Sequence, residues 1–246
     1  MEHQNLISVI IPALNEELGI KKTLLGIPKK ELSDQGYDLE ILVIDGNSDD
    51  RTRYVAEKLG AKVIIERRKG YGRAYKTGLQ EAKGCIIVTL DADGTYPASL
   101  IPNYIQQLKE RTLDFITINR FSRMENNAMG FSHRIGNKLL TFAMFLLYSV
   151  KIKDSQSGMW IMSKKFIDGI NLQSDGFPLS EEIKIIAFKF FVAVELDGVY
   201  YRRVGKLKLG TITDGWRNLK YLFKYKSLIN NALMPVSEPL QKEPTY

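Results

Sequence analysis

Residues 86–97 are Ile86-Ile87-Val88-Thr89-Leu90-Asp91-Ala92-Asp93-Gly94-Thr95-Tyr96-Pro97. The short apolar run, rich in β-branched residues, predicts a buried strand. In a parallel α/β sheet, ligands bind beyond the carboxyl ends of the strands, and Asp91 and Asp93 follow such an end. Two carboxylates this close repel each other unless a cation lies between them, and a divalent metal holding a diphosphate suits them. Taken alone, such a pair more often forms a polar turn and a helix N-cap before Pro97.

The chain before this stretch alternates between apolar strands and helices. Strands are predicted over residues 6–12, 39–45 and 61–65. Helices are predicted from about residue 15 to 26, from the turn at 46–50 to about residue 59, and from 73 to about 83. Asn15 is a candidate N-cap of the first helix. This alternation predicts an α/β fold with a doubly wound, mostly parallel sheet.

The pattern continues more loosely after residue 97. We expect helices over 97–111, 134–151, 179–191 and 216–231, strands over 114–119, 157–163 and 192–201, and an irregular polar loop over 120–130. No linker separates two folding units. We therefore expect a single domain over residues 1–212, followed by a basic, aromatic C-terminal helix and tail over 213–246.

The composition restricts the class of protein and of partner. The 246 residues are 44% hydrophobic and 26% charged, which is typical of a globular protein, and the net charge of +7 suits an anionic partner. Nucleic acid is not expected, because the aromatic residues fall mostly in apolar periodic segments. The single cysteine, Cys85, excludes a disulfide framework.

The sequence also bears on membrane attachment. We see no signal peptide, and the longest apolar stretch, from Leu139 to Val150, is shorter than the roughly 20 residues of a transmembrane helix. We expect a cytoplasmic protein that binds peripherally to the cytoplasmic face of the membrane, directly or through a partner protein.

Several motifs, in order, resemble those of a known family. They are Val9-Ile10-Ile11-Pro12-Ala13-Leu14-Asn15-Glu16, Val43-Ile44-Asp45-Gly46-Asn47-Ser48-Asp49-Asp50, Lys69-Gly70-Tyr71-Gly72-Arg73-Ala74, Asp91-Ala92-Asp93-Gly94-Thr95-Tyr96-Pro97, Ile118-Asn119-Arg120-Phe121, Arg134-Ile135-Gly136-Asn137-Lys138-Leu139-Leu140 and Asp154-Ser155-Gln156-Ser157-Gly158-Met159. Together they resemble family-2 glycosyltransferases with the GT-A fold, in particular the polyprenyl-phosphate (dolichol-phosphate) hexosyltransferases. The resemblance covers roughly residues 6 to 210.

The resemblance implies roles on the side of the sugar donor. Asp91 and Asp93 would hold Mg²⁺ or Mn²⁺ on the diphosphate of a nucleoside-diphosphate sugar, with Asp93 counted as catalytic. The positions that would contact the nucleotide are Pro12, Leu14, Glu16, Asp45, Ala74, Asp91 and Ala92. The alternative for Asp45 is an acid in a turn at the end of a strand.

A late basic loop, resembling one that folds over the diphosphate and acceptor, would contribute Arg202 and Lys208. The doubled Arg202-Arg203 leaves the register of this loop open by one residue.

The acceptor side of the resemblance fits a lipid phosphate. A phosphate monoester has a second pKa near 6, so it needs no general base, but it needs cations that overcome repulsion from the donor. Arg120, Arg134 and Lys138 would supply them, with Asn137 in the same site. Asp154 is expected to orient the sugar or a basic residue; the alternative is that it acts as the base for a hydroxyl acceptor.

Two helices are candidates for contact with a membrane surface. The first is apolar nearly all round from Leu139 to Tyr148 and is bracketed by Arg134, Lys138, Lys151 and Lys153. The second, from Trp216 to Lys226, is basic and aromatic. The alternatives are packing on the sheet or a homo-oligomer interface.

These features predict an inverting, metal-dependent glycosyltransferase. It would move a hexose from GDP-mannose, UDP-glucose or UDP-N-acetylglucosamine to a membrane polyprenyl (dolichyl) phosphate. Two alternatives remain open: a family-2 transferase that uses a saccharide hydroxyl with Asp154 as base, and a catalytically silent nucleotide-binding membrane module.

Overall fold

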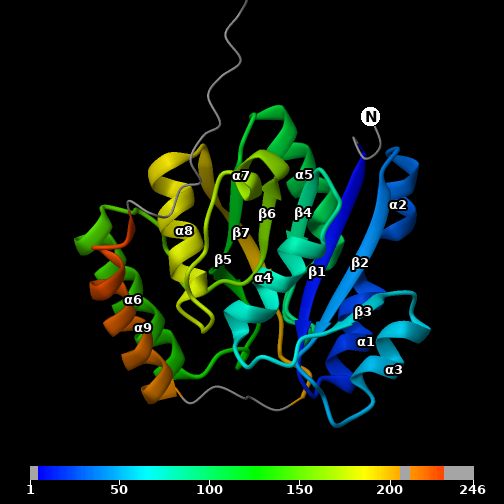
Figure 1. The fold of residues 1–246 in the computed structure, drawn as a ribbon, viewed down its shortest axis with the longest axis horizontal. Helices are drawn as coiled ribbons and strands as arrows, with labels where there is room; N and C mark the ends of the chain where they lie inside the picture. Colours follow the sequence, from blue (N-terminus) through cyan, green and yellow to red (C-terminus); the bar gives the residue numbers. More distant parts are fainter. Residues whose placement is uncertain (1–4, 206–210, 230–246) are drawn as a thin grey trace, which may run out of the picture.

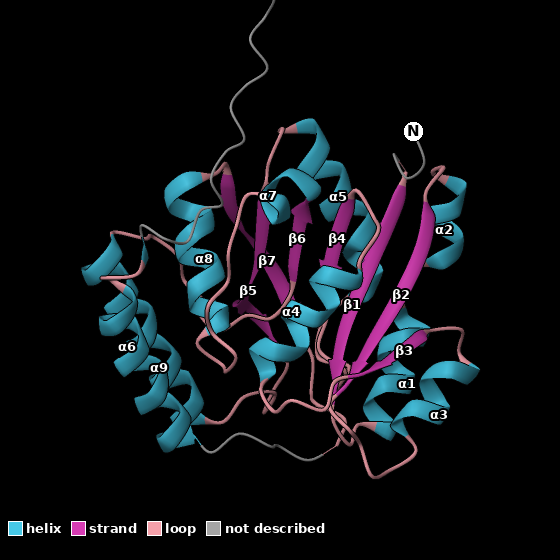
Figure 2. Ribbon diagram, viewed as in Figure 1, coloured by secondary structure: helices cyan, strands magenta, loops and turns pink. Residues whose placement is uncertain are grey.

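A seven-stranded sheet with helices on both faces forms the protein (Figures 1 and 2). The computed structural model describes residues 5–205 and 211–229. In chain order the elements are β1 (Leu6–Ala13), α1 (Glu17–Gly26), α2 (Lys29–Asp34), β2 (Asp38–Asp45), α3 (Thr52–Lys58), β3 (Lys62–Ile65), α4 (Tyr71–Glu81), β4 (Ile86–Thr89), the 3₁₀ helix η1 (Ala98–Leu100), α5 (Ile101–Glu110), β5 (Phe115–Met124), α6 (Phe131–Tyr148), β6 (Trp160–Ser163), α7 (Lys164–Asp168), α8 (Leu179–Phe190), β7 (Ala193–Tyr200) and α9 (Thr211–Tyr225).

The strand order is β3-β2-β1-β4-β6-β5-β7, and β6 alone among these strands runs opposite to the others. The predicted α/β class, with a doubly wound and mostly parallel sheet in one domain, is confirmed. The carboxyl ends of β1, β2 and β4 therefore lie at one edge of the sheet. Because β6 is reversed, the segment that leads into it starts from that same edge.

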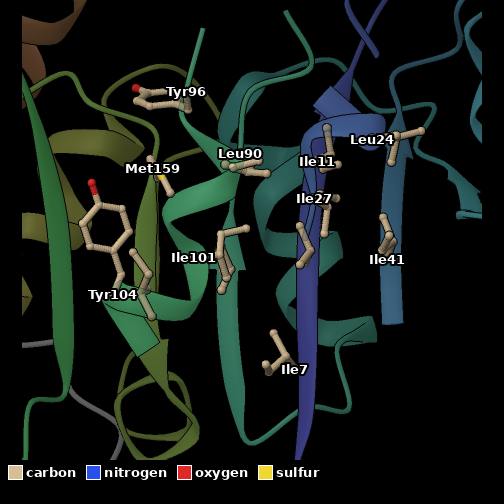
Figure 3. Close-up of a cluster of buried hydrophobic side chains, with 14 of the residues drawn as sticks. Ile7, Ile11, Leu24, Ile27, Ile41, Leu90, Tyr96, Ile101, Tyr104 and Met159 are labelled. Atoms are coloured by element: carbon tan, nitrogen blue, oxygen red, sulfur yellow. The ribbon is translucent and has the colours of Figure 1, made fainter. Parts of the chain in front are cut away.

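Both faces of the central strands are buried, as expected for parallel strands covered by helices. On one face, Ile7 and Ile11 of β1 pack with Leu24 of α1, Ile41 of β2 and Ile101 of α5 (Figure 3). On the other face, a second apolar cluster joins β1, β2 and β4 to α4, α6, α8 and α9. The two clusters hold the site-bearing edge on a rigid sheet.

Two local predictions were wrong, and two short helices were not predicted. The polar loop predicted from Arg120 was wrong up to Met124, because β5 continues through a register shift against β7 between Asn119 and Arg123. Asn15 is not the N-cap of α1: its φ is 51°, it bonds to the turn at Ser48 and Asp49, and Glu16 holds the N-cap position. The short helices α2 and α7 were not anticipated.

The helix predicted over residues 216–231 begins earlier, at Thr211, and ends at Tyr225. Lys208 and the predicted tail from residue 235 lie outside the described residues.

Candidate active site

The strand ends bring the predicted donor residues to one edge of the sheet. β1 and β2 pair in register as far as Ala13 and Asp45, and the main-chain N–H of Leu90 donates to Ile10 at 3.1 Å. The segments that follow β1, β2 and β4 are therefore neighbours. In the view of Figure 2, β1 and β2 begin near the N-terminus and end at the opposite, lower edge.

The two carboxylates after β4 have different surroundings. The Oδ1 atom of Asp93 accepts from Thr95 through its main-chain N–H (3.1 Å) and its hydroxyl (2.6 Å). Asp93 Oδ2 accepts no hydrogen bond from the described part of the chain, but it lies 2.7 Å from Arg203 Nη2. Burial, and next the charge of Asp93, raise the pKa of Asp91 to about 7. One oxygen of Asp93 thus fixes the turn while the other faces a cation.

This donor set fits a divalent metal that also binds a diphosphate. Mg²⁺ is commonly held by one or two carboxylates together with substrate phosphates and water. Within residues 5–205 and 211–229, no group of three or more His, Cys, Asp or Glu side chains forms a complete metal cage. Asp91 and Asp93 therefore suit a metal whose remaining ligands come from the substrate.

Glycines allow close packing around the acidic pair. A Cβ atom on Gly19 of α1 would lie 2.6 Å from the carbonyl oxygen of Ala92 and 2.8 Å from Cα of Asp93. A Cβ atom on Gly158 would lie 2.9 Å from Asp91 Oδ1. The loop after β4 is thus clamped between α1 and the segment before β6, which fixes the direction of both carboxylates.

The segment 201–205, here called the strap, crosses from β7 to the acidic pair. The main-chain N–H of Tyr201 donates to Thr95 at 2.9 Å, and that of Val204 donates to Asp93 at 2.9 Å. These bonds place Arg203 between Asp93 and Glu16, with Nη1 3.7 Å from Glu16 Oε1.

The sequence predicted Arg202 as a contact of the diphosphate, with the register of this basic loop open by one residue. In the structure, the side chain of Arg202 is exposed and its main-chain N–H donates to Glu125. The doubled arginine was the available signal for Arg203. It did not specify the register, which depends on the two main-chain hydrogen bonds of the strap.

On the acceptor side, Asp154 is fully buried and all its oxygens are engaged. Oδ2 accepts from Arg120 through Nε (2.7 Å) and the main-chain N–H (3.1 Å). Oδ1 accepts from Arg120 Nη2 (2.8 Å), Asn137 Nδ2 (2.7 Å) and the main-chain N–H of Gln156 (3.1 Å). Arg120 lies at the register shift in β5, between Asn119 and Arg123.

Electrostatics reinforce this pairing. Burial alone raises the pKa of Asp154, but the charge and hydrogen bonds of Arg120 outweigh it and lower the value to about 2. The Arg120 guanidinium also lies over the ring of Tyr200, 5.3 Å from its centre. Asp154 is therefore ionised at neutral pH and is a weak proton acceptor.

The remaining predicted nucleotide contacts differ in accessibility. Leu14 is 45% exposed and Pro12 is partly exposed, whereas Ala74, on the buried face of α4, belongs to the second apolar cluster. Asp45 is fully buried and accepts from the main-chain N–H of Ser48 at 2.9 Å and from its hydroxyl at 2.5 Å. In this structure Asp45 orders the turn after β2.

The predicted acceptor cations fall into two groups. Arg120 and Asn137 meet at Asp154, whereas Arg134 and Lys138 are exposed on the outer side of α6. Arg134 Nη2 lies 3.1 Å from the sulfur of Met124. The pKa of His133 is lowered by burial and then by the charges of Arg120 and Arg203, so this imidazole lies within the field of both arginines.

A groove of about 760 Å³ lies between α6, residues 150–153 and the edge strand β7. Apolar side chains line it together with basic and two acidic ones: Phe142, Phe145, Val150, Ile152, Val194, Leu196, Arg111, Lys138, Lys151, Lys153, Glu195 and Asp197, with Thr141. Thr141 also donates to Asn137 Oδ1 at 3.1 Å, and Glu195 accepts from the main-chain N–H groups of Lys153 and Asp154. Thr141 and Glu195 therefore line the groove and also belong to the hydrogen-bond network around Asp154.

The helix α6 has one buried face and one exposed apolar face. Leu140, Met144 and Tyr148 are buried, whereas Phe131, Ile135, Leu139, Phe142, Phe145 and Leu146 are exposed, with Phe131 at 79% and Leu146 at 62%. One side of α6 thus packs on the protein, whereas the predicted contact of its other side with a membrane stays a prediction. Across the residues that the structure describes, no helix has the length and hydropathy needed to span a bilayer.

Sequence comparison places these features among known proteins. Residues 8–170 match the family model described as glycosyl transferase family 2. The low-salt glycan biosynthesis hexosyltransferase Agl6 of Haloferax volcanii is 31% identical over 222 residues, covering 88% of this chain and 52% of its own length. The dolichol-phosphate mannosyltransferase of Pyrococcus furiosus is 30% identical over 239 residues, covering 92% of this chain and 66% of its own length. The chain thus spans between half and two thirds of the length of these two relatives.

A solved structure supports the same fold. Glucosyl-3-phosphoglycerate synthase from Mycobacterium tuberculosis, crystallised with Mn²⁺, UDP and glucosyl-3-phosphoglycerate, superposes with a TM-score of 0.69 at 20% identity, covering 92% of this chain and 81% of that one. At this identity the likeness concerns the fold. The match of residues 8–170 to the family model and the two relatives of 30% and 31% identity identify the chain as a member of glycosyl transferase family 2.

Proposed function

We propose that the protein is a metal-dependent, inverting glycosyltransferase that moves a hexose from a nucleoside-diphosphate sugar to a membrane polyprenyl phosphate. One observation carries the choice of acceptor. Both oxygens of Asp154 are engaged by Arg120 and Asn137, and its pKa is lowered to about 2. A group with this pKa is a poor general base at neutral pH, so the acceptor should arrive already ionised, as a phosphate does.

The donor half supports binding of a diphosphate. Asp91 and Asp93 would hold Mg²⁺ or Mn²⁺, which as a Lewis acid would neutralise charge on the departing nucleoside diphosphate. Arg203 lies beside this pair and would contact the same diphosphate. The nucleotide would be bordered by Pro12 near the end of β1 and by Leu14 and Glu16 just after it. Asp45 would order the neighbouring turn after β2.

The chemistry balances without a proton acceptor. A phosphate oxygen of the acceptor attacks the anomeric carbon, and the bond from that carbon to the diphosphate oxygen breaks. The electron pair leaves with the nucleoside diphosphate. Arg120, held in orientation by Asp154, would bring positive charge to the acceptor phosphate, while Arg134 and Lys138 would attract it at the surface. Single displacement inverts the anomeric configuration.

The lipid part of the acceptor is supported by two surfaces. The groove beside α6 combines an apolar lining with Lys138, Lys151 and Lys153, which suits an isoprenoid chain that carries an anionic head. The exposed apolar face of α6, flanked by Arg134 and Lys138, suits the interface of an anionic membrane. We therefore propose that the protein attaches peripherally to the membrane through α6. The exposed side chains of Trp216 and Phe223 on α9 would add to this contact.

The relatives' names agree with this proposal. Beside the mannosyltransferase above, a protein of Haloferax volcanii named dolichyl-phosphate hexose transferase is 27% identical over 210 residues, covering 85% of this chain and 89% of its own length. The identity of the sugar and nucleotide is left open among GDP-mannose, UDP-glucose and UDP-N-acetylglucosamine. A homo-oligomer or membrane partner protein is compatible with the exposed face of α6.

A radiolabel transfer assay tests the proposal. GDP- and UDP-sugars would be offered with dolichyl or undecaprenyl phosphate in detergent, with Mg²⁺, Mn²⁺ or EDTA. We expect EDTA-sensitive label in the lipid phase from one donor. Its pH dependence should have an acid limb near the acceptor pKa, about 6, with the same shape in Asp154→Asn.

Other results would contradict the proposal in distinct ways. Metal-dependent nucleotide release without labelled lipid would point to a hydroxyl acceptor and to Asp154 as its base. Tight nucleotide binding without turnover would favour a silent membrane module.

A further inference from the structure

The loop of residues 154–158, here called the acceptor loop, is held by a side chain that the proposed chemistry does not use. Gln156 Nε2 donates to Glu181 Oε1 of α8 at 2.8 Å. Gln156 Oε1 accepts from Asn218 Nδ2 of α9 at 3.0 Å. Gln156 therefore bridges two helices and links the loop that carries Asp154 to the C-terminal helix.

Two buried oxygens in this bridge have no hydrogen-bond partner among the described residues. They are Oε2 of Glu181, which is fully buried, and Oδ1 of Asn218, which is 3% exposed. Burial raises the pKa of Glu181 to about 8, against the influence of Gln156, Lys184 and Asn218. A protonated carboxyl at Glu181 would supply a hydrogen-bond donor within this buried bridge. A neutral Glu181 explains how both helices tolerate this buried pair.

The main chain of the same loop is fixed separately by Lys184 of α8. Its Nζ donates to the carbonyls of Ser155 at 2.9 Å and Ser157 at 2.7 Å, and to the hydroxyl of Ser180 at 2.8 Å. The ammonium also lies 5.4 Å from the centre of the Trp160 ring. Lys184 thus anchors the loop to α8 alone, whereas the contact of Gln156 with Asn218 is what ties the loop to α9.

The position of α9 gives this tie a consequence for the site. α9 packs against α6 and α8, with Leu222 and Tyr225 fully buried, and it follows the strap in the chain. The strap carries Arg203 to the acidic pair, and Asn218 reaches the acceptor loop. The same C-terminal segment therefore contacts the donor side through the strap and the acceptor side through α9.

We propose that Gln156, Glu181 and Asn218 are positioning residues through which α9 holds the acceptor loop, and with it Asp154 and Arg120, in the geometry that receives the acceptor. The acceptor readout below rests on the proposed function. The positioning itself does not, because the loop amides report it directly: Ser155 N–H donates to Thr141, Gln156 N–H to Asp154 and Gly158 N–H to Tyr96.

The test compares three variants of the bridge with a surface control. Asn218→Leu and Gln156→Met remove the hydrogen bonds while filling the space. Glu181→Gln keeps an acceptor for Gln156 and a donor towards Asn218. Lys220→Ala alters the exposed face of α9. Hydrogen exchange of the full-length protein, followed by mass spectrometry of peptides containing residues 154–158, is the first measurement.

We expect exchange of the acceptor-loop amides to accelerate about tenfold in Asn218→Leu and Gln156→Met, which corresponds to one lost hydrogen bond. Glu181→Gln and Lys220→Ala should resemble the wild type. In the transfer assay, the KM for polyprenyl phosphate should rise about tenfold in the first two variants, with the KM for the donor changed less than twofold.

Unchanged exchange in Asn218→Leu and Gln156→Met would overturn the proposal, as would equal losses on the donor and acceptor sides. Glu181→Gln behaving like Asn218→Leu would overturn the role of the neutral carboxyl. If exchange is faster in the two variants as expected, but the wild type transfers no sugar to polyprenyl phosphate, the positioning role stands and the proposed function is wrong.

Discussion

Arg203 Nη2 lies 2.7 Å from Asp93 Oδ2, which joins the strap after β7 to the loop after β4. Burial lowers the pKa of Arg203, but the charges of Asp93, Asp91, Tyr200 and Glu16 together outweigh it, so the pKa lies above its ordinary value. A guanidinium at this position compensates the acidic pair. It also borders the space that a metal-bound diphosphate would enter.

Replacing Arg203 should impair the reaction far more than replacing its neighbour. We expect Arg203→Ala to lower kcat roughly 10²-fold, because a charge-stabilising donor beside the leaving group is lost. Arg202→Ala should have a much smaller effect, since the Arg202 side chain is exposed. Steady-state rates for the two variants check this, with unfolding curves as controls. Equal losses would show that the strap shifts register when substrate binds.

The acidic pair should be needed for metal-supported donor binding. We expect Asp93→Asn and Asp91→Asn to abolish measurable transfer, because a metal would lose one of its two carboxylates. The unfolding midpoint should stay close to that of the wild type, because an asparagine side chain keeps an oxygen that can accept the hydrogen bonds from Thr95, and a neutral amide suits the burial that raises the pKa of Asp91. Titration of the nucleotide with and without Mn²⁺, followed calorimetrically, should lose its metal dependence in both variants. Asp49→Asn, an exposed acid beyond β2, is the matched control. Metal-dependent binding that survives in both variants would place the metal elsewhere.

The Arg120–Asp154 pair should make stability depend on pH. Asp154→Asn should lower the free energy of unfolding at pH 7 by about 3–5 kcal/mol, because it leaves a buried guanidinium unpaired. The folded-state pKa of about 2 lies below the ordinary 3.8, so this stabilisation is present above about pH 4 and is lost as the pH falls towards 2.

Urea unfolding of both proteins at several pH values between 7 and 2.5 measures this difference. The gap between wild type and variant should narrow as Asp154 of the wild type becomes protonated. A gap that stays constant across this range would mean that the carboxylate charge contributes nothing to the folded state.

The exposed face of α6 should bind anionic membranes. Leu139→Asp or Leu146→Asp should reduce binding to vesicles that contain phosphatidylglycerol about tenfold or more, because burial of a leucine side chain contributes about 1.5–3 kcal/mol. Leu25→Asp on α1, where the leucine is 64% exposed, is the matched control. Flotation of vesicles at low and high salt measures it. Equal effects of all three substitutions would exclude α6 as the contact surface.

The donor half was largely predictable from sequence because its signals are local. Each βα unit carries its own apolar strand, polar turn and helix, so the alternation up to Asp93 specifies both the sheet and the edge where ligands bind. The acidic pair follows its strand directly. The main local error, the role of Asn15, arose because the side chain bonds to a turn more than thirty residues away.

The acceptor half depends on contacts that no local pattern encodes. Arg120 lies at the register shift in β5, and Asp154, 34 residues later, lies in the segment that leads into the reversed strand β6. Gln156, Glu181 and Asn218 come from three elements, and their partnership has no sequence signature. The choice of Arg203 over Arg202 depends on two main-chain bonds between distant segments.

The strand order also makes the chain divisible. All of β1 to β4 and the acidic pair precede residue 100, whereas Arg120, Asp154 and α6 follow it, so the proposed donor and acceptor sites lie in consecutive sections of the chain. Chimeras joined between α5 and β5 should therefore exchange acceptor preference while keeping the donor. Two segments of the later section return to the acidic pair: the strap brings Arg203 to Asp93, and Gly158 packs against Asp91. A working hybrid must keep both contacts matched.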